Sequence, residues 1–253
     1  TAKNKTSDPI QEAQINEEIE TTHKELKNAG LLIITFGSAF VYRYKKTDRF
    51  VGNCHRIPSG EFEKLLLSKE EIISEWQKQI DALKKFNPQL SILFTVSPVR
   101  YVRDGLIENN RSKGILLDAV HTLIEQNTNC SYFPAYEIVI DELRDYRFYK
   151  EDLVHPNHLA INYVWEKFVA NCCDENTQKF LAEYEPLLKG LRHRSLNEET
   201  EAHQKFKLEL EEKIRLKKVK FKTISIIAIL SNLESKTKSK TLDNFTENIE
   251  IVK

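Results

Sequence analysis

The sequence contains no methionine and few cysteines, and it offers no CxxC pair. The four cysteines are Cys54, Cys130, Cys172 and Cys173, of which only the last two are neighbours. Adjacent cysteines rarely meet the geometry of a disulfide. We therefore expect reduced thiols, which are typical of a cytoplasmic protein.

Long apolar runs are also absent. The longest, residues 226–230, is too short to cross a bilayer, so the sequence predicts no membrane span. An excess of one charge is lacking too, because 38 Lys and Arg balance 38 Asp and Glu. This balance gives no reason to expect nucleic acid or an anionic membrane surface as a partner. With 40% hydrophobic and 30% charged residues, the composition is typical of a globular protein.

Alternating strand and helix signals predict an α/β protein. Residues 31–36 and 92–96 are almost continuously apolar, which is typical of strands buried on both faces of a parallel sheet. Between them, a capping box of Ser68 and Glu71 begins an amphipathic helix that ends at Asn87-Pro88. A helical pattern at 116–124 and a short strand at 131–133 follow, and a further helix is expected after Asn157, which suits an N-cap. This order predicts right-handed crossovers and a parallel sheet.

The chain divides into three parts by composition. Residues 1–30 are polar and helical at best, and residues 31–190 carry the α/β pattern. Residues 191–253 predict a charged helical extension and a tail that we expect to be weakly ordered beyond Phe221, because it is rich in Thr, Ser, Lys and Asn.

The sharpest chemical signal is Asp152-Leu153-Val154-His155-Pro156. In parallel α/β folds the chemistry lies in the loops after the carboxyl ends of the strands, which begin here at Gly37, Ser97 and Pro134. The last of these loops leads to His155. An Asp three residues before a His can accept the Nδ1–H and leave Nε2 to take a proton from a nucleophile. By itself the pattern also fits an ordinary Asp–His pair on the surface.

Residues 132–149, just before Asp152, are dense in aromatic, acidic and Arg side chains. They predict either an active-site wall that positions a polar, sugar-like substrate, or a solvated charged loop with a few aromatic anchors. The sequence favours neither interpretation.

Two other chemistries are compatible with nearby residues but less favoured. Cys54 could be a thiol nucleophile beside His55, although neighbouring side chains rarely face each other productively and buried cysteines are usually inert. Asp152, His155 and His158 could bind zinc with help from His55, although a catalytic zinc needs three convergent ligands. We therefore expect neither a metal nor an organic cofactor.

Several blocks of sequence together resemble the GSCFA domain, a branch of the SGNH (GDSL-like) hydrolases, over roughly residues 30–215. The blocks are TFGSAF (35–40), VGNCHRIP (51–58), TVSPVR (95–100) followed by DG (104–105) and NNRSK (109–113), YFPAYEI (132–138), DELRDYRFY (141–149), DLVHP (152–156) and the late segment RHRS (192–195). The resemblance implies a flavodoxin-like three-layer α/β/α sandwich that hydrolyses or transfers an ester-linked acyl group. It implies His155 as the general base, Asp152 as its orienting acid, and Asn53 and Gly37 as oxyanion donors.

The family is named for a Gly-Ser-Cys-Phe-Ala motif that carries the nucleophile upstream of the TFGSAF-like block. No such motif precedes Leu31, so we expect the chain to begin partway through the domain, without the serine. Alternatively, Gly37-Ser38-Ala39-Phe40 itself resembles the motif, and Ser38 would be the nucleophile. The other interpretation of Ser38 is a turn residue at the end of the strand.

The sequence thus supports three hypotheses. The first is a serine esterase or deacylase that acts on a small-molecule or glycan ester, including O-acylated glycans. The second is a catalytically incomplete fragment or pseudoenzyme that binds a glycan or a protein. The third is an O-acyltransferase, which would use the same residues.

Overall fold

The computed structural model describes most of the chain up to Arg192 and a few later positions. The Asn53 and Cys54 side chains, His55 and the tail predicted after Phe221 lie outside the described residues. The described ranges are 9–51 and 57–192, followed by 205, 206, 208, 209, 211–213 and 215.

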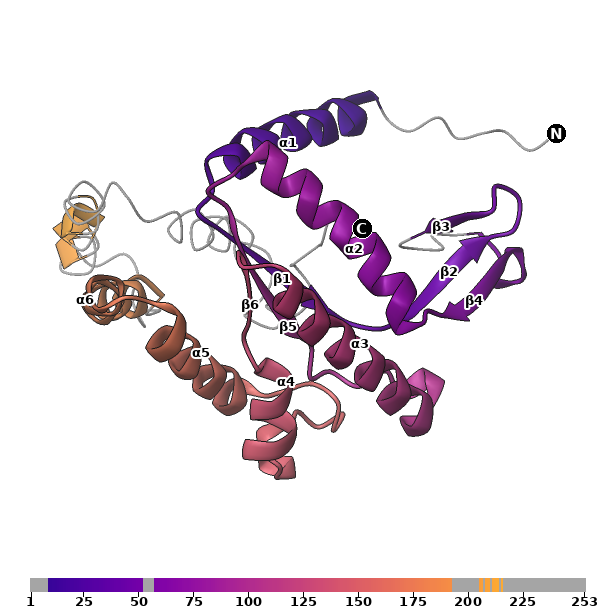
Figure 1. Cartoon of the computed structure of the whole chain (residues 1–253). Helices are drawn as coiled ribbons and strands as arrows, with labels where there is room; N and C mark the ends of the chain where they lie inside the picture. The colour runs from indigo at the N-terminus through magenta and orange to yellow at the C-terminus, as the bar shows by residue number, and fades with distance from the viewer. Residues whose placement is uncertain are drawn as a thin grey trace. The chain divides into compact units, whose positions relative to one another are not determined.

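Three strands form a parallel sheet (Figure 1). Its order is β1 (Leu31–Phe36), β5 (Ser91–Val96) and β6 (Cys130–Tyr132). The predicted α/β class is therefore confirmed, and the arrangement is consistent with a flavodoxin-like fold. The third strand begins one residue earlier than predicted. Its pairing ends where the Phe133 N–H donates to the Phe94 carbonyl (2.8 Å), just before Pro134 turns the chain.

Helices α2 (Lys69–Phe86) and α3 (Leu106–Gln126) lie side by side against one face of this sheet (Figure 1). Alternate residues of β1 and β5 face them, because side chains in a strand alternate between its two faces. The Phe36 and Phe94 rings stack with their centroids 5.6 Å apart, and Trp76 meets both rings edge-on. The core on this face consists of buried strand and helix residues: Ile34, Phe36, Ile92, Phe94, Val96, Ile72, Ile80, Leu116, Ala119, Val120 and Leu123.

The predicted capping box of α2 is confirmed. The Ser68 hydroxyl accepts the Glu71 N–H (3.2 Å), and the Glu71 carboxylate accepts the Ser68 N–H (2.8 Å). At the other end of α2, the side-chain amide of Asn87 donates to the carbonyls of Leu26 and Ala29. This amide ties the end of α1 (Pro9–Asn28) to the end of α2.

A second, antiparallel sheet follows β1 directly and was not predicted. Its order is β3 (Arg49–Val51), β2 (Phe40–Tyr44) and β4 (Phe62–Leu66). These strands are largely half-buried and carry charged residues, so they lack the continuous apolar run that marks β1 and β5. Their pairing also depends on contacts distant in sequence, such as the ion pair of Arg43 with Glu63 (2.6 Å).

The segment between β6 and α5 contains short helical turns rather than a plain loop. These are α4 (Ala135–Glu137), a π-helical turn at Ile138–Glu142 and a 3₁₀ turn at Tyr146–Phe148. Helix α5 (His158–Cys172) then begins as predicted, because the Asn157 side chain accepts the N–H groups of Leu159 (3.0 Å) and Ala160 (3.3 Å).

The structure packs as two units that divide after Ala160. In the second unit, helix α6 (Glu175–Arg192) buries Phe180 and Tyr184, whose rings stack 5.1 Å apart. Among the described helices, none is long and apolar enough to cross a membrane.

Replacing Ser68 with Ala should lower the free energy of unfolding by about 1 kcal/mol, because it removes the side-chain acceptor of the capping box. Ser74→Ala, at an exposed position inside α2, is the matched control and should be neutral or slightly stabilising, since Ala favours the helix interior. Urea denaturation of both variants measures the difference. Equal stabilities would show that the cap contributes nothing.

Candidate active site

Asp152 and His155 form a hydrogen-bonded pair. The ring Nδ1 of His155 lies 2.6 Å from one carboxylate oxygen of Asp152. The other oxygen accepts the main-chain N–H groups of Val154 (2.8 Å) and His155 (2.9 Å). The contact that the sequence predicts is therefore present.

The surroundings of Asp152 define where the shared proton lies. Hydrogen bonds from the main-chain N–H groups of His155 and Val154, and then from the His155 ring, lower the pKa of the Asp152 carboxyl to about 2. The carboxylate is therefore ionised at neutral pH and can only accept hydrogen bonds. The proton between the two groups belongs to Nδ1, so Nε2 of the neutral ring carries a free lone pair. Both side chains are partly exposed, at 46% for Asp152 and 39% for His155, so solvent and solutes can reach them.

The loop that carries the pair is held by its own main chain. The Lys150 N–H donates to the His155 carbonyl (2.8 Å), and Tyr149 and Pro156 form an isolated antiparallel bridge. Leu153, between the two members of the pair, has a φ of +57°, a left-handed conformation that is uncommon for a side chain of this kind. This turn allows the N–H groups that follow Leu153 to point back at Asp152.

Arg100 joins this loop to the carboxyl end of β5. Its guanidinium donates to the Leu153 carbonyl (3.3 Å) and lies over the ring of Tyr149, 4.9 Å from the ring centre. Because Arg100 follows β5 by only four residues, the Asp152–His155 loop is anchored at the carboxyl edge of the parallel sheet. Parallel α/β folds place their ligands at this edge.

The stretch predicted as an active-site wall has both buried and exposed members. Tyr149 is buried, whereas Tyr146 is 67% exposed. The Tyr132 hydroxyl donates to the Glu137 carboxylate (2.9 Å), and burial together with this carboxylate raises the pKa of Tyr132 far above its usual value. Tyr132 and Glu137 are thus occupied with each other, whereas Tyr146 and Arg147 are exposed, with Arg147 3.6 Å from the Asp145 carboxylate.

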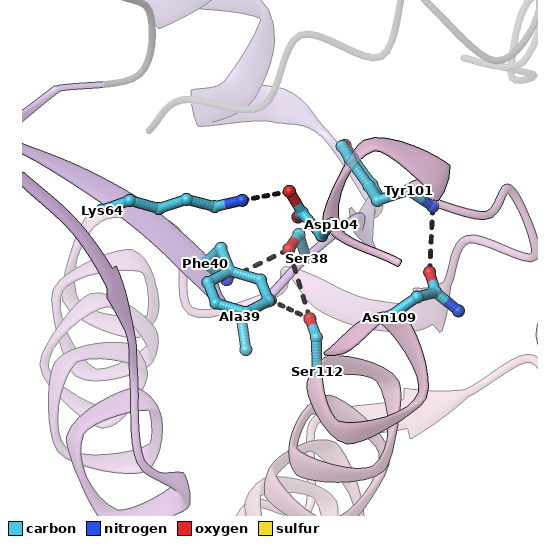
Figure 2. A network of polar contacts seen from close by, with 8 residues as sticks. All are labelled: Ser38, Ala39, Phe40, Lys64, Tyr101, Asp104, Asn109 and Ser112. Atoms are coloured by element: carbon cyan, nitrogen blue, oxygen red, sulfur yellow. Dashed lines mark hydrogen bonds and ion pairs between the residues drawn. The ribbon is translucent and has the colours of Figure 1, made fainter. Parts of the chain in front are cut away.

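Ser38 lies just after β1, and its hydroxyl is bound to other residues. It accepts the Phe40 N–H (3.1 Å) and lies 3.2 Å from the hydroxyl of Ser112 (Figure 2). Within the described part of the chain, no hydrogen bond connects Ser38 with His155. The structure therefore does not join Ser38 to the Asp152–His155 pair.

Gly37 directly follows β1 and lies close to the ring of Tyr101. A Cβ at this position would lie 3.0 Å from the Tyr101 hydroxyl oxygen. The Gly37 carbonyl accepts a hydrogen bond from the Lys113 ammonium (2.6 Å). The other oxyanion donor implied by the resemblance, Asn53, lies outside the described residues.

A buried polar face on α3 was missed as a functional feature. Asn109, Ser112 and Lys113 are only 1–3% exposed, and each binds a main-chain group of the loops after β1 and β5. Asn109 accepts the Tyr101 N–H (3.0 Å), and Ser112 accepts the Ala39 N–H (2.7 Å), as Figure 2 shows.

Lys113 occupies the middle of this arrangement. Its ammonium donates to the carbonyls of Gly37 and Ser97, both at 2.6 Å, and lies 5.7 Å from the centre of the Tyr101 ring. Burial lowers the pKa of Lys113 to about 8, because the charged form loses its hydration.

A signal for this face exists in the sequence. Positions 109, 112 and 113 continue, at helical spacing, the apolar stripe of Leu116, Ala119, Val120 and Leu123. Three polar residues on a stripe otherwise directed at the core indicate buried hydrogen-bonding groups.

An ion pair also connects the loop after β5 to β4. Lys64 of β4 binds Asp104, at the end of a 3₁₀ turn at Val102–Asp104 (Figure 2). No group of three or more His, Cys, Asp or Glu side chains converges on a metal position within the described residues.

A model of the GSCFA family matches residues 3–168 of the chain. The match includes the whole parallel sheet, helix α3 and the Asp152–His155 loop. The α/β domain with this pair at the carboxyl edge of its sheet therefore belongs to the GSCFA family. Neither a curated protein nor a solved structure matches the chain.

The pKa of Lys113 predicts how it affects stability. Between about pH 8 and its usual pKa of about 10.5, the unfolded chain binds more protons at this residue than the folded chain does. The contribution of Lys113 to the free energy of unfolding should therefore rise with pH across this interval, by up to about 3 kcal/mol.

Urea denaturation of the wild type and Lys113→Met between pH 7 and pH 10 measures this effect. The difference should shift in favour of the wild type above pH 8. Lys78→Met removes the same charge from an exposed position on α2, together with an ion pair to Glu75, so its curve reports the effect of losing a surface charge. A wild type minus Lys113→Met difference that does not change with pH, after correction by this control, contradicts the lowered pKa.

Proposed function

We propose that this chain carries the base and the orienting acid of an SGNH-type serine ester hydrolase. The observation that carries the proposal is the Asp152–His155 pair, with Nε2 free, at the carboxyl edge of a parallel sheet in a chain of the GSCFA family. A base so oriented and so exposed is suited to accept a proton from a hydroxyl nucleophile.

In the proposed reaction, Nε2 of His155 takes the proton of a serine hydroxyl as its oxygen attacks the ester carbonyl. The Asp152 carboxylate stabilises the resulting imidazolium through Nδ1–H. The tetrahedral intermediate collapses to an acyl-enzyme as the protonated His155 gives its proton to the leaving alkoxide. Water then attacks the acyl group as His155 takes a proton from it. The acyl–serine bond breaks, the acid is released, and His155 returns the proton to the serine oxygen.

The nucleophile that we propose is the serine of a Gly-Ser-Cys-Phe-Ala motif, which the printed sequence does not contain. The hydrogen bonds of Ser38 to Ser112 and Phe40 favour a structural role for Ser38 over a nucleophilic one. By the same resemblance, Gly37 and Asn53 supply oxyanion donors.

The proposed substrate is an ester whose alcohol or acyl part is polar, with O-acylated glycans as the favoured class. The exposed Tyr146 and Arg147, near the pair in sequence, are side chains that suit stacking on a sugar ring and hydrogen bonding to its hydroxyls.

Transfer of the acyl group to a sugar instead of water would use the same catalytic residues. Analysis of the products with and without a glycan acceptor separates the two reactions.

The second function is a binding role without catalysis. The observation that favours it is the lack of a described hydrogen bond between Ser38 and His155. In that case the exposed aromatic and Arg side chains would bind a glycan or a protein, and no covalent chemistry would occur.

Labelling with a serine-reactive fluorophosphonate, followed by intact mass, tests the proposed nucleophile. We expect no adduct on the chain of 253 residues, and one adduct when an upstream segment with the Gly-Ser-Cys-Phe-Ala motif is added. His155→Ala should lower the labelling rate of that longer protein by about 1000-fold, because the base is lost. His158→Gln, at the exposed start of α5, is the control and should label at the wild-type rate.

The other outcomes of this labelling are equally informative. A His155-dependent adduct on the 253-residue chain would make Ser38 the favoured nucleophile. No adduct on either protein would contradict the esterase proposal and favour the binding role.

Asp152→Asn tests the assignment of the His155 tautomer without any assay of activity. The Asn side-chain oxygen can still accept the N–H groups of Val154 and His155, but its amide then faces Nδ1 as a donor. We expect the ring proton to move to Nε2, which the ¹⁵N chemical shifts of the imidazole report. Asp81→Asn, on the surface of α2, is the control. Unchanged shifts in Asp152→Asn would contradict the assignment.

A further inference from the structure

Of the main-chain N–H groups just after β1, those of Ala39 and Phe40 are bound, and those of Gly37 and Ser38 form no hydrogen bond with a described residue. The Ala39 N–H donates to Ser112 (2.7 Å), and the Phe40 N–H donates to the hydroxyl of Ser38 (3.1 Å). The Ser38 N–H forms no hydrogen bond with any residue that the structure describes. Figure 2 shows this turn lying against Ser112 of α3.

The carbonyl of the peptide unit that contains the Ser38 N–H is itself hydrogen-bonded. Lys113 binds the Gly37 carbonyl (2.6 Å), and the described chain has no cis peptide bond. In a trans peptide the C=O and the following N–H point in opposite directions, so the Ser38 N–H points away from Lys113. Because the same ammonium binds the Ser97 carbonyl, it fixes this peptide relative to the end of β5.

The free N–H also lies at the edge of the sheet where the Asp152–His155 loop is anchored. It follows the carboxyl end of β1, while Arg100 reaches from the carboxyl end of β5 to Leu153. Unbound main-chain N–H groups with a fixed orientation are the donors that stabilise an oxyanion.

We propose that Lys113 is a positioning residue that orients the Gly37–Ser38 peptide so that the Ser38 N–H stabilises the oxyanion of the ester-cleaving reaction. This inference rests on the proposed function. The ammonium also polarises the peptide, because a cation at the carbonyl oxygen strengthens the N–H as a donor.

A role in folding alone does not account for a lysine here. Two carbonyls can be satisfied by neutral N–H donors without burying a charge. Lys113 is 1% exposed, and burial is the cause of its lowered pKa, with no carboxylate contributing to the shift. The positive charge therefore has a cost in stability that a catalytic function would explain.

Steady-state ester hydrolysis by the protein that carries the proposed nucleophile tests the proposal with Lys113→Gln. The expected result is a fall in kcat of about 100-fold with a KM within about threefold of the wild type, since an oxyanion donor acts in the transition state. Lys78→Gln, which removes an exposed charge on α2, should leave both constants unchanged. A folded Lys113→Gln variant with the wild-type kcat would overturn the inference while the proposed function stands.

Lys113→Arg provides a second test, which does not depend on whether Lys113→Gln folds. In the wild type, kcat should fall as the pH rises above about 8, when the ammonium loses its proton, whereas Lys113→Arg should keep its activity at that pH. Tyr101, whose ring faces the ammonium, is the nearby titratable group, and Tyr101→Phe should keep the wild-type profile.

Identical alkaline profiles for the wild type and Lys113→Arg would overturn the inference. A wild type without His155-dependent turnover would overturn the proposed function and this inference together.

Discussion

The two 2.6 Å hydrogen bonds from the Lys113 ammonium hold together the ends of the two strands on which the site depends. One strand leads to Gly37 and Ser38, and the other leads to Arg100, which supports the loop of Asp152 and His155. A buried charge of this kind is costly to desolvate, so it persists only where the surrounding groups satisfy it closely. The adjacent contacts of Asn109 and Ser112 on α3 fix the same two loops, so that one helix face sets the geometry of both.

The Asp152–His155 pair is built on a different physical basis. Both side chains are accessible to solvent, and their orientation comes from main-chain hydrogen bonds within a short loop rather than from burial. The left-handed Leu153 is the local strain that makes this geometry possible, and non-glycine residues keep such a conformation only where the surroundings over-determine it. The bridge of Tyr149 with Pro156 and the hydrogen bond from Arg100 provide that support. An exposed imidazole held in this way can meet a solute without a rearrangement of the fold.

Family membership and the geometry of the pair give the proposed esterase its basis, and the contacts of Ser38 bear on the choice of nucleophile. Ser38 has hydroxyl and main-chain partners, and neither is a base. In our proposal the turn contributes through its main chain. The Ser38 N–H has no described partner, and it follows the Gly37 carbonyl that Lys113 binds. The Ser38 side chain thus forms the turn after the strand, while we propose that its main-chain N–H binds the oxyanion.

The sequence by itself determined the elements whose signals are local. These are the apolar runs of β1 and β5, the capping box of Ser68 and Glu71, the Asn157 cap, and the Asp152–His155 contact, which spans only three residues. Only the tertiary structure decided the antiparallel sheet, the contact of Arg100 with Leu153, and the insertion of Lys113 between Gly37 and Ser97. The physical reason is that no periodicity or capping pattern specifies which groups will meet in these interactions, and the contacts of Arg100 and Lys113 join residues 16 to 76 positions apart.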